Sequence, residues 1–316
     1  MVAEQRSEAR QDATRNLVAV GVDGTARSSG AIRYAADEAV RGGAVLRLVH
    51  VSPWYVPMAP LPLTLEDLQT TAREVLEAAT REALDRQSVL PLETEHETGS
   101  RVTGLLKGAS GARLLVLGRE TRSGVERMAA GATTTSVAAR AESTVVVVPD
   151  SWDGSAAHGR VLLGIKRAAT SPYLLARAFK LARERGATLV VVHAWRMPDA
   201  YTDLIARRVR PEEWRAEGLR MLTSLLTPWR AEYPDVEVEM NVDHGTAVDV
   251  LVRHSARADA VVVVRHPRDA TRPRSLGSVP RAMLRYSAAP VEVVPDGPEE
   301  DLVPGLVLEE DGQILR

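Results

Sequence analysis

Glycine and hydroxyl residues follow one apolar run in the first half of the chain, where a turn could bind an anion. Gly118 ends the apolar run L-L-V-L-G, and Gly131 stands thirteen positions later, directly ahead of Ala132, Thr133 and Thr134. Glycines let backbone N–H groups approach phosphate oxygens without a Cβ in the way. A helix beginning after Gly131 would add its N-terminal dipole, and a threonine hydroxyl there could donate to a phosphate oxygen. Gly118 can also simply mark the end of a strand, so an anion-binding turn and a structural glycine both stay open.

A carboxylate is the second candidate for chemistry. The first apolar run of the chain, N-L-V-A-V-G-V, ends in Gly21 and Val22, and Asp23 follows at once. An acid at the end of a buried strand could line a ligand pocket. Asp in an Asp-Gly-Thr sequence also favours turns and helix caps, so both interpretations of Asp23 stay open.

Other catalytic and metal-binding patterns are absent from the sequence. There is no Cys, no G-x-S-x-G elbow, no G-x-x-x-x-G-K-(S/T) loop and no G-x-G-x-x-G fingerprint. The seven His show no metal-ligand spacing with acids. His50 and His193 end matching apolar runs, so we expect them to be structural, and we expect Asp243-His244 to cap a helix after a strand. An enzyme, such as a nucleotide hydrolase, is the least favoured interpretation.

These candidates belong to a pattern that the chain contains twice. V-V-V-V-P-D (145–150) matches V-E-V-V-P-D (291–296), and V-L-R-L-V-H-V (45–51) matches T-L-V-V-V-H-A (188–194). The offset is 146 residues at the first pair (296 − 150) and 143 at the second (193 − 50). A repeat of this length predicts two domains of ordinary size. We expect a disordered leader at 1–14, domains at 15–150 and 160–296, a linker at 151–159 and an acidic tail at 297–316.

Strands and helices alternate along both copies. Near-continuous apolar runs predict strands covered on both faces, as in a parallel sheet, and apolar residues at a 3.6-residue period predict helices. Each copy is therefore expected to be an α/β, doubly wound, Rossmann-like domain with a five-stranded, mainly parallel sheet flanked by helices. The expected strands are 16–22, 45–51, 92–97, 114–118, 144–148, 161–165, 188–194, 236–242, 261–264 and 291–294. The expected helices are 31–40, one after a capping box of Thr64 and Asp67, 101–109, 132–140, 171–185, 211–227, 246–257 and 278–286.

The expected sheet places the candidate residues together. In an open α/β sheet, ligands bind outside the carboxyl ends of the strands, where the strand order reverses. Asp23, Val51 and Gly118 stand at the ends of three expected strands, so they should share one edge.

Composition limits the classes of partner that the chain is expected to bind. The net charge is −2, so no overall field attracts nucleic acid or anionic lipid. No apolar run reaches the roughly 18 residues that a membrane span needs. The lack of Cys suits a reducing compartment. We expect a cytoplasmic protein that binds neither nucleic acid nor membranes.

Four features taken together resemble the universal stress protein family. They are G-V-D-G-T after the first strand, V-H-V, the spacing Gly118-x2-Thr121-x9-Gly131, and the V-V-P ending of each copy. Nucleotide-binding members carry G-x2-G-x9-G-(S/T) at this loop, and tandem members are similar in length to this chain. The resemblance implies ATP, with Mg²⁺, as the ligand. The nucleotide-binding residues that it implies are Gly21, Val22, Asp23, Val51, Leu117, Gly118, Gly131, Ala132, Thr133 and Thr134.

The first copy departs from this motif at two positions. Thr121 replaces the second glycine, and its branched side chain resists positive φ. Ala132 replaces the first hydroxyl residue. We therefore expect a partly degraded site, to which Arg119, Arg122 and Arg127 could add phosphate contacts.

The second copy departs further. Lys166 stands where the first copy has Asp23, and aligning Gly277 with Gly131 puts Val264 and Pro267 at the two glycine positions. Pro267 removes a backbone donor. We expect this copy to hold no nucleotide.

The resemblance implies a stress-response regulatory or protective factor rather than an enzyme. The alternative is a dimeric interaction scaffold that binds no nucleotide. Its V-V-V-V and V-E-V-V strands would pair, either between two chains as a homodimer or within one chain as a pseudo-dimer, and the protein partner is unknown.

Overall fold

The computed structural model describes residues 16–53, 64–119, 132–155, 157–166, 170–265, 276–295, 307–308 and 314–315. Its contacts divide the chain into two compact units, Met1–Ser155 and Ala156–Arg316. The expected leader at 1–14 and most of the tail lie outside the described residues. Within the tail, β11 (Val307–Leu308) and β12 (Ile314–Leu315) form a short antiparallel pair.

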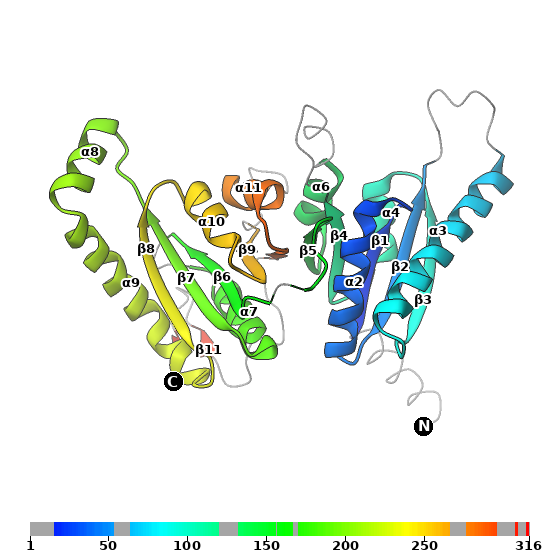
Figure 1. The fold of residues 1–316 in the computed structure, drawn as a ribbon, viewed down its shortest axis with the longest axis horizontal. Coiled ribbons are helices and arrows are strands. Elements are labelled where there is room, and N and C mark those ends of the chain that lie inside the picture. The colour runs from blue at the N-terminus through cyan, green and yellow to red at the C-terminus, as the bar shows by residue number, and fades with distance from the viewer. Residues whose placement is uncertain are drawn as a thin grey trace. The chain divides into compact units, whose positions relative to one another are not determined.

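The first unit contains a parallel sheet in the order β3-β2-β1-β4-β5 (Figure 1). All four strand pairings are parallel. The chain leaves β1 for β2 on one side and later adds β4 on the other, so the strand order reverses between β1 and β4. The elements are β1 (Leu17–Val22), α2 (Ala26–Arg41), β2 (Val45–Ser52), α3 (Leu65–Arg86), β3 (Leu92–Thr98), α4 (Arg101–Gly108), β4 (Leu114–Arg119), α6 (Ala132–Arg140) and β5 (Thr144–Pro149).

The second unit repeats this order as β8-β7-β6-β9-β10, again with parallel pairings. The elements are β6 (Arg160–Ile165), α7 (Pro172–Arg185), β7 (Thr188–Trp195), α8 (Ala200–Val209), α9 (Pro211–Glu232), β8 (Val238–His244), α10 (Ala247–Ser255), β9 (Ala260–Val264), α11 (Ser278–Tyr286) and β10 (Val291–Val294). The expected α/β fold, doubly wound and present twice, is confirmed.

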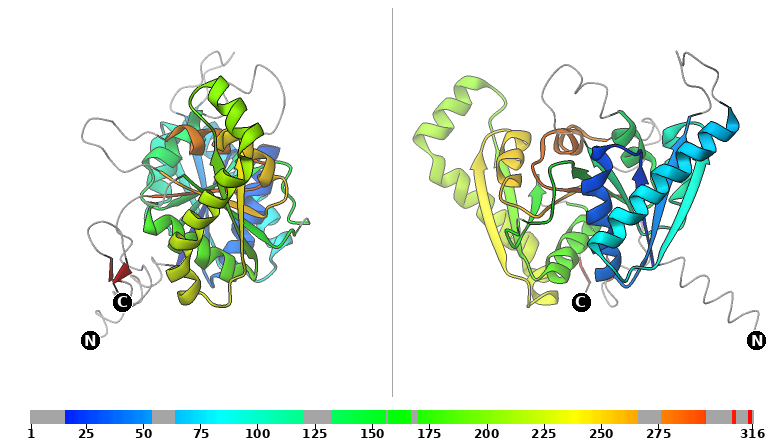
Figure 2. Two further views of the ribbon diagram at one scale, coloured as in Figure 1. Left: turned by 90° about the vertical axis from the view of Figure 1, so that its left-hand side faces the viewer. Right: turned by 45° about the vertical axis from the view of Figure 1, so that its right-hand side comes forward.

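Helices cover both faces of the sheet in the first unit. On one face lie α2 and α3 (Figure 2). They pack on strand residues such as Val20, Leu48 and Val116, all fully buried. On the other face, α4 lies so close to the sheet that a Cβ on Gly104 would come within 2.6 Å of Val51. Burial on both faces explains why these strands read as continuous apolar runs.

Several boundaries differ from those expected. α2 begins at Ala26 rather than near 31, because Thr25 caps it and accepts a hydrogen bond from the backbone N–H of Arg27. α9 continues past Pro228 to Glu232, because Trp229 is buried and stacks on Phe179. β8 spans 238–244 rather than 236–242, and α8 was not expected at all.

The prediction that Asp243 and His244 cap a helix is wrong. Both are the last residues of β8, and α10 is capped instead by Thr246. Asp243 accepts hydrogen bonds from His254 at 2.8 Å and Arg253 at 3.2 Å. His244 pairs with Asp203 of α8 at 2.9 Å. These side chains therefore join strands to helices instead of ending a helix.

Candidate functional site

The reversal of strand order in the first unit defines the candidate site. Val20 of β1 is paired with Val116 of β4, so Val22 and Gly118 stand at the same level two residues further on. His50 of β2 is paired with Val22. The carboxyl ends of the three strands therefore meet at one edge, beside the position where such sheets bind ligands.

Asp23 lies at this edge, held by the turn into α2. Its Oδ1 accepts hydrogen bonds from Thr25 N–H at 3.0 Å, the Thr25 hydroxyl at 2.6 Å and the Ser28 hydroxyl at 2.8 Å. Desolvation raises the pKa of Asp23, but these hydrogen bonds and the charge of Arg27 outweigh it and leave the pKa below its ordinary value. Asp23 is thus a fixed, ionised carboxylate that organises the start of α2, while Oδ2 accepts none of these bonds.

Gly118 has a packing role that needs no ligand. A Cβ added to it would collide with the carbonyl oxygen of Arg27 and lie 2.8 Å from the carbonyl carbon. Gly30 of α2 similarly faces the carbonyl oxygen of Pro149, which a Cβ would approach to 2.8 Å. These two glycines let α2 cross β4 and the end of β5 at close range. The spacing that indicated a phosphate loop is therefore also a helix-packing requirement.

Gly21, Val51 and Leu117 of the predicted site are packed under α4, whereas Val22 is packed on the opposite face, in the core under α2 and α3. A Cβ on Gly21 would come within 2.7 Å of Leu105 and 2.8 Å of Leu117. Val22, Val51 and Leu117 are buried. Only the backbone of these residues is therefore placed to meet a ligand at the carboxyl edge.

The first turn of α6 supplies the remaining predicted residues. Ala132 is exposed, and Thr133 and Thr134 are partly exposed as the second and third residues of the helix. The first N–H groups of a helix have no partner within the helix and favour anions. Gly131, Thr121, Arg122 and Arg127 lie outside the described residues. The structure thus places Asp23 and the start of α6 after β1 and β4, the two strands of the reversal.

The histidines at the strand ends are structural, as expected. His50 Nδ1 lies 2.9 Å from the carbonyl oxygen of Val22, and His193 Nδ1 lies 3.0 Å from that of Ile165. Each histidine therefore ties the ends of two adjacent strands together in its own domain. No three His, Asp or Glu side chains gather as a metal site among the described residues.

The corresponding edge of the second unit is built differently. Lys166, which is exposed, follows β6, and Val264 ends β9. Val264 has a side chain where Gly118 has none. α7 begins at Pro172, which corresponds to position 29 (172 − 143), three residues later than the start of α2. Pro267 lies outside the described residues.

A proline that the sequence analysis passed over adds to this difference. Pro280 is the third residue of α11, where α6 has Thr134 (280 − 146). Proline is tolerated in a first helical turn but has no N–H. The start of α11 therefore offers one backbone donor fewer to an anion. The signal was present in the sequence as a proline just inside an expected helix.

Among the described residues, no helix is long and apolar enough to cross a membrane.

Comparison with known proteins identifies relatives of both halves. The sequence profile of the universal stress protein family matches residues 15–149 and 158–295. A universal stress protein of Mycolicibacterium smegmatis is 33% identical over 294 residues, covering 90% of this chain and 98% of the relative. One of Mycobacterium tuberculosis is 31% identical over 292 residues, covering 87% and 96%. The crystal structure of a universal stress protein from Archaeoglobus fulgidus has a TM-score of 0.66 at 18% identity, covering 90% of this chain and 99% of that one.

Proposed function

The chain belongs to the universal stress protein family, and we propose that it is a cytoplasmic, stress-linked regulatory or protective protein whose N-terminal domain binds ATP without hydrolysing it. The family supplies the link to stress. Nucleotide binding is a proposal, supported by the edge where the strand order reverses between β1 and β4.

One observation supports nucleotide binding: a fixed, ionised Asp23 follows β1, and the first turn of α6 follows β4, the two strands of this reversal. The carboxylate can accept hydrogen bonds from the nucleoside, and the helix start can donate to phosphate oxygens. Mg²⁺ would arrive with the nucleotide phosphates, because Mg²⁺ is commonly held by substrate phosphates together with one or two carboxylates. The C-terminal domain, with Lys166, Val264 and Pro280, is proposed to bind none.

Asp23→Asn tests this proposal while sparing the fold. The amide oxygen can still accept the bonds from Thr25 and Ser28, so α2 keeps its cap, but the negative charge is lost. A charged hydrogen bond is worth about 1.5–3 kcal/mol, so calorimetry with ATP and Mg²⁺ should show affinity at least about tenfold weaker. Gly118→Asp is unsuitable, because its side chain would collide with the Arg27 carbonyl whether or not ATP binds.

Asp153→Asn is the matched control. Its Oδ1 also accepts from the N–H and hydroxyl of the residue two positions later, Ser155, at 2.8 and 2.6 Å, but it follows β5 rather than β1. ATP affinity should not change in this variant. Equal affinity in the wild type and Asp23→Asn would refute the site.

A nucleotide-free interaction scaffold is the second candidate. Two observations favour it. The close crossing of α2 explains why position 118 is glycine, and the hydrogen bonds at the start of that helix explain the presence of Asp23. Association would use the last strands, β5 and β10, either within one chain or between two chains of a homodimer. The scaffold would also bind an unidentified protein partner. Absence of any heat of binding at millimolar ATP would select this candidate.

A further inference from the structure

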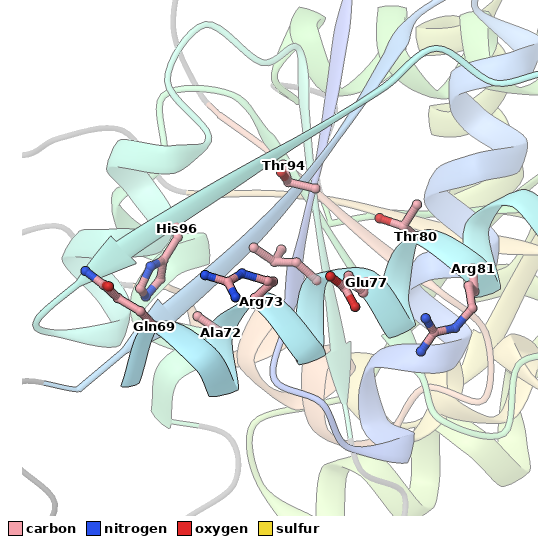
Figure 3. Close-up of a pocket in the computed structure, with 9 residues that line it drawn as sticks. Gln69, Ala72, Arg73, Glu77, Thr80, Arg81, Thr94 and His96 are labelled. Carbon is pink, nitrogen blue, oxygen red and sulfur yellow. The ribbon is translucent and has the colours of Figure 1, made fainter. Parts of the chain in front are cut away.

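A groove of about 700 Å³ runs between α3 and β3 (Figure 3). Arg73, Glu77 and Arg81 line it from α3, and Thr94 and His96 face them from β3. β3 is two strands removed from β1 and ends the strand order of its unit. The groove therefore borders the outer edge of the sheet.

In the described residues of the C-terminal domain, apolar side chains occupy part of the equivalent place. α3 and α9 both span 22 residues and β3 and β8 both span 7, at one offset of 146 (211 − 65 and 238 − 92). Arg73, Thr94 and His96 then correspond to Leu219, Met240 and Val242. Val242 is buried, and Leu219 and Met240 pack against the core of their unit. At these three positions the side chains are apolar and packed in one copy and line an open groove in the other, while Glu77 and Arg81 correspond to the exposed Thr223 and Thr227.

The two arginines of the groove are available to a ligand. Among the residues that the structure describes, neither Arg73 nor Arg81 forms a hydrogen bond or ion pair, and both are exposed. They are eight residues apart on α3, which is about 12 Å along a helix axis. In an extended chain, residues four apart share a face and are separated by about 13 Å. The spacing of the arginines therefore matches two acidic side chains of an extended segment.

The edge of β3 offers main-chain partners to such a segment. Among the described residues, β3 pairs with β2 alone. Pro91 O and Gly99 N–H bond to β2, and backbone groups alternate in direction along a strand, so those of 93, 95 and 97 also face β2. The N–H and C=O groups of Thr94 and His96 then point away from β2, to the open edge.

The acidic side chains of β3 lie on the opposite face from the groove. Glu93 pairs with Arg47 at 2.6 Å, and Glu97 pairs with Lys107 of α4 at 2.8 Å. The groove itself carries two arginines against the one carboxylate of Glu77. Antiparallel pairing with β3 of a second copy would place the glutamate faces of the two strands side by side, and charged edges oppose such self-association; a segment whose carboxylates face the groove lies on the other face from these glutamates. The occupant is therefore a different protein.

We propose that an extended acidic segment of a partner protein adds to β3 as a further strand and places two carboxylates, four residues apart, on Arg73 and Arg81. Strand addition gives affinity through main-chain hydrogen bonds and specificity through side-chain contacts on one face. This interaction does not depend on whether the N-terminal domain binds ATP.

The probe is a fluorescent octapeptide of alternating glutamate and threonine, measured by anisotropy against the full chain. The wild type should bind it and should not bind the lysine–threonine counterpart. Arg73→Glu with Arg81→Glu should weaken binding at least tenfold, whereas Arg215→Glu, at an exposed position on α9, should leave it unchanged. Arg73→Leu with Thr94→Met, which fills the groove as the C-terminal domain does, should also weaken binding at least tenfold.

Backbone pairing is tested separately from charge. A further peptide is N-methylated on both its glutamates and its threonines, because reversal of the strand direction exchanges the set of amides that faces β3; this peptide should lose binding. Exchange of the Thr94 and His96 amides should slow in the complex. Several outcomes would overturn the proposal: no binding at millimolar peptide, undiminished binding of the methylated peptide, equal binding by the charge-reversed chain, or equal competition by free glutamate, which would indicate a small-anion site.

Discussion

At the scale of single residues, the carboxyl ends of the strands carry side chains that serve the fold before any ligand. The clearest is the histidine near the end of the second strand of each domain, with the same bond to the preceding strand's carbonyl oxygen in both copies. This contact is present both in the domain with the proposed site and in the domain without it, so it does not depend on nucleotide. Its effect should therefore appear in stability.

His50 should make the stability of the protein pH-dependent. Burial lowers the pKa of His50, with nearby His96 and Arg101 adding to the shift, against the opposing effects of the Val22 carbonyl and Asp23. The unfolded chain, with a pKa of about 6.5, then binds a proton more readily than the folded protein. Stability is therefore full above that value and falls as the pH drops below it.

Urea unfolding at pH 7.5 and 5.5 measures this loss. His50→Gln can keep a donor for the Val22 carbonyl but cannot take up a proton, so it should lose less stability on acidification than the wild type. An identical loss in both proteins would show that other groups cause the pH dependence.

At the scale of elements, helix starts differ in how well their sequences specify them. Thr64 and Asp67 form the predicted capping box of α3, with Asp67 N–H donating to the Thr64 hydroxyl at 3.1 Å and Thr64 N–H donating to Asp67 at 2.8 Å. Ser100 precedes α4 in the same position but makes no side-chain capping bond. Thr64 is therefore a side-chain cap of its helix, and Ser100 is not.

Substitution of each residue by alanine should change the stability of the protein by different amounts. Thr64→Ala should reduce the free energy of unfolding by about 1 kcal/mol, the usual value for a lost N-cap, whereas Ser100→Ala should change it by less than about half of that. Chemical denaturation of the two variants measures the difference. Equal losses would mean that the capping box contributes nothing specific to α3.

The sequence predicts the strands well, because their apolar runs reflect burial on both faces and recur in two copies. It fails where tertiary contacts override local signals. α9 passes Pro228 because Trp229 is buried against Phe179. α8 is held by the pairing of Asp203 with His244, 41 positions away, which no local pattern reveals.

The candidate site was predictable only in part. Topology and repeat place Asp23, Val51 and Gly118 at one edge, and the structure agrees. The contact between Gly118 and the Arg27 backbone could not be predicted, because it depends on which helix crosses which strand. The α3–β3 groove left a readable signal: Arg73 and Thr94 stand where the other copy has Leu219 and Met240.

At the scale of the whole molecule, one architecture is used twice with different surfaces. The N-terminal copy has a helix start with no proline in its first turn, Gly118 near the end of β4, and an open groove at its edge strand. The C-terminal copy has Val264, Pro280 and a filled groove at the equivalent places. Both differences put the polar, accessible features in the same copy. The chain should therefore behave as one binding domain joined to one that binds no nucleotide.

Nucleotide should accordingly act on one half of the chain. Calorimetry should give one ATP per chain rather than two, because Pro280 and Lys166 remove a donor and an acid from the second edge. Hydrogen exchange measured by mass spectrometry should show ATP slowing the amides of Asp23–Ser28 and the first turn of α6, with no change near Lys166 or α11. Asp23→Asn should lose the protection of both first-domain segments together, since they would contact the same ligand. Protection at α11, or a stoichiometry of two, would contradict this division, because it would mean that a helix start lacking one N–H, beside a lysine instead of an aspartate, still holds the nucleotide.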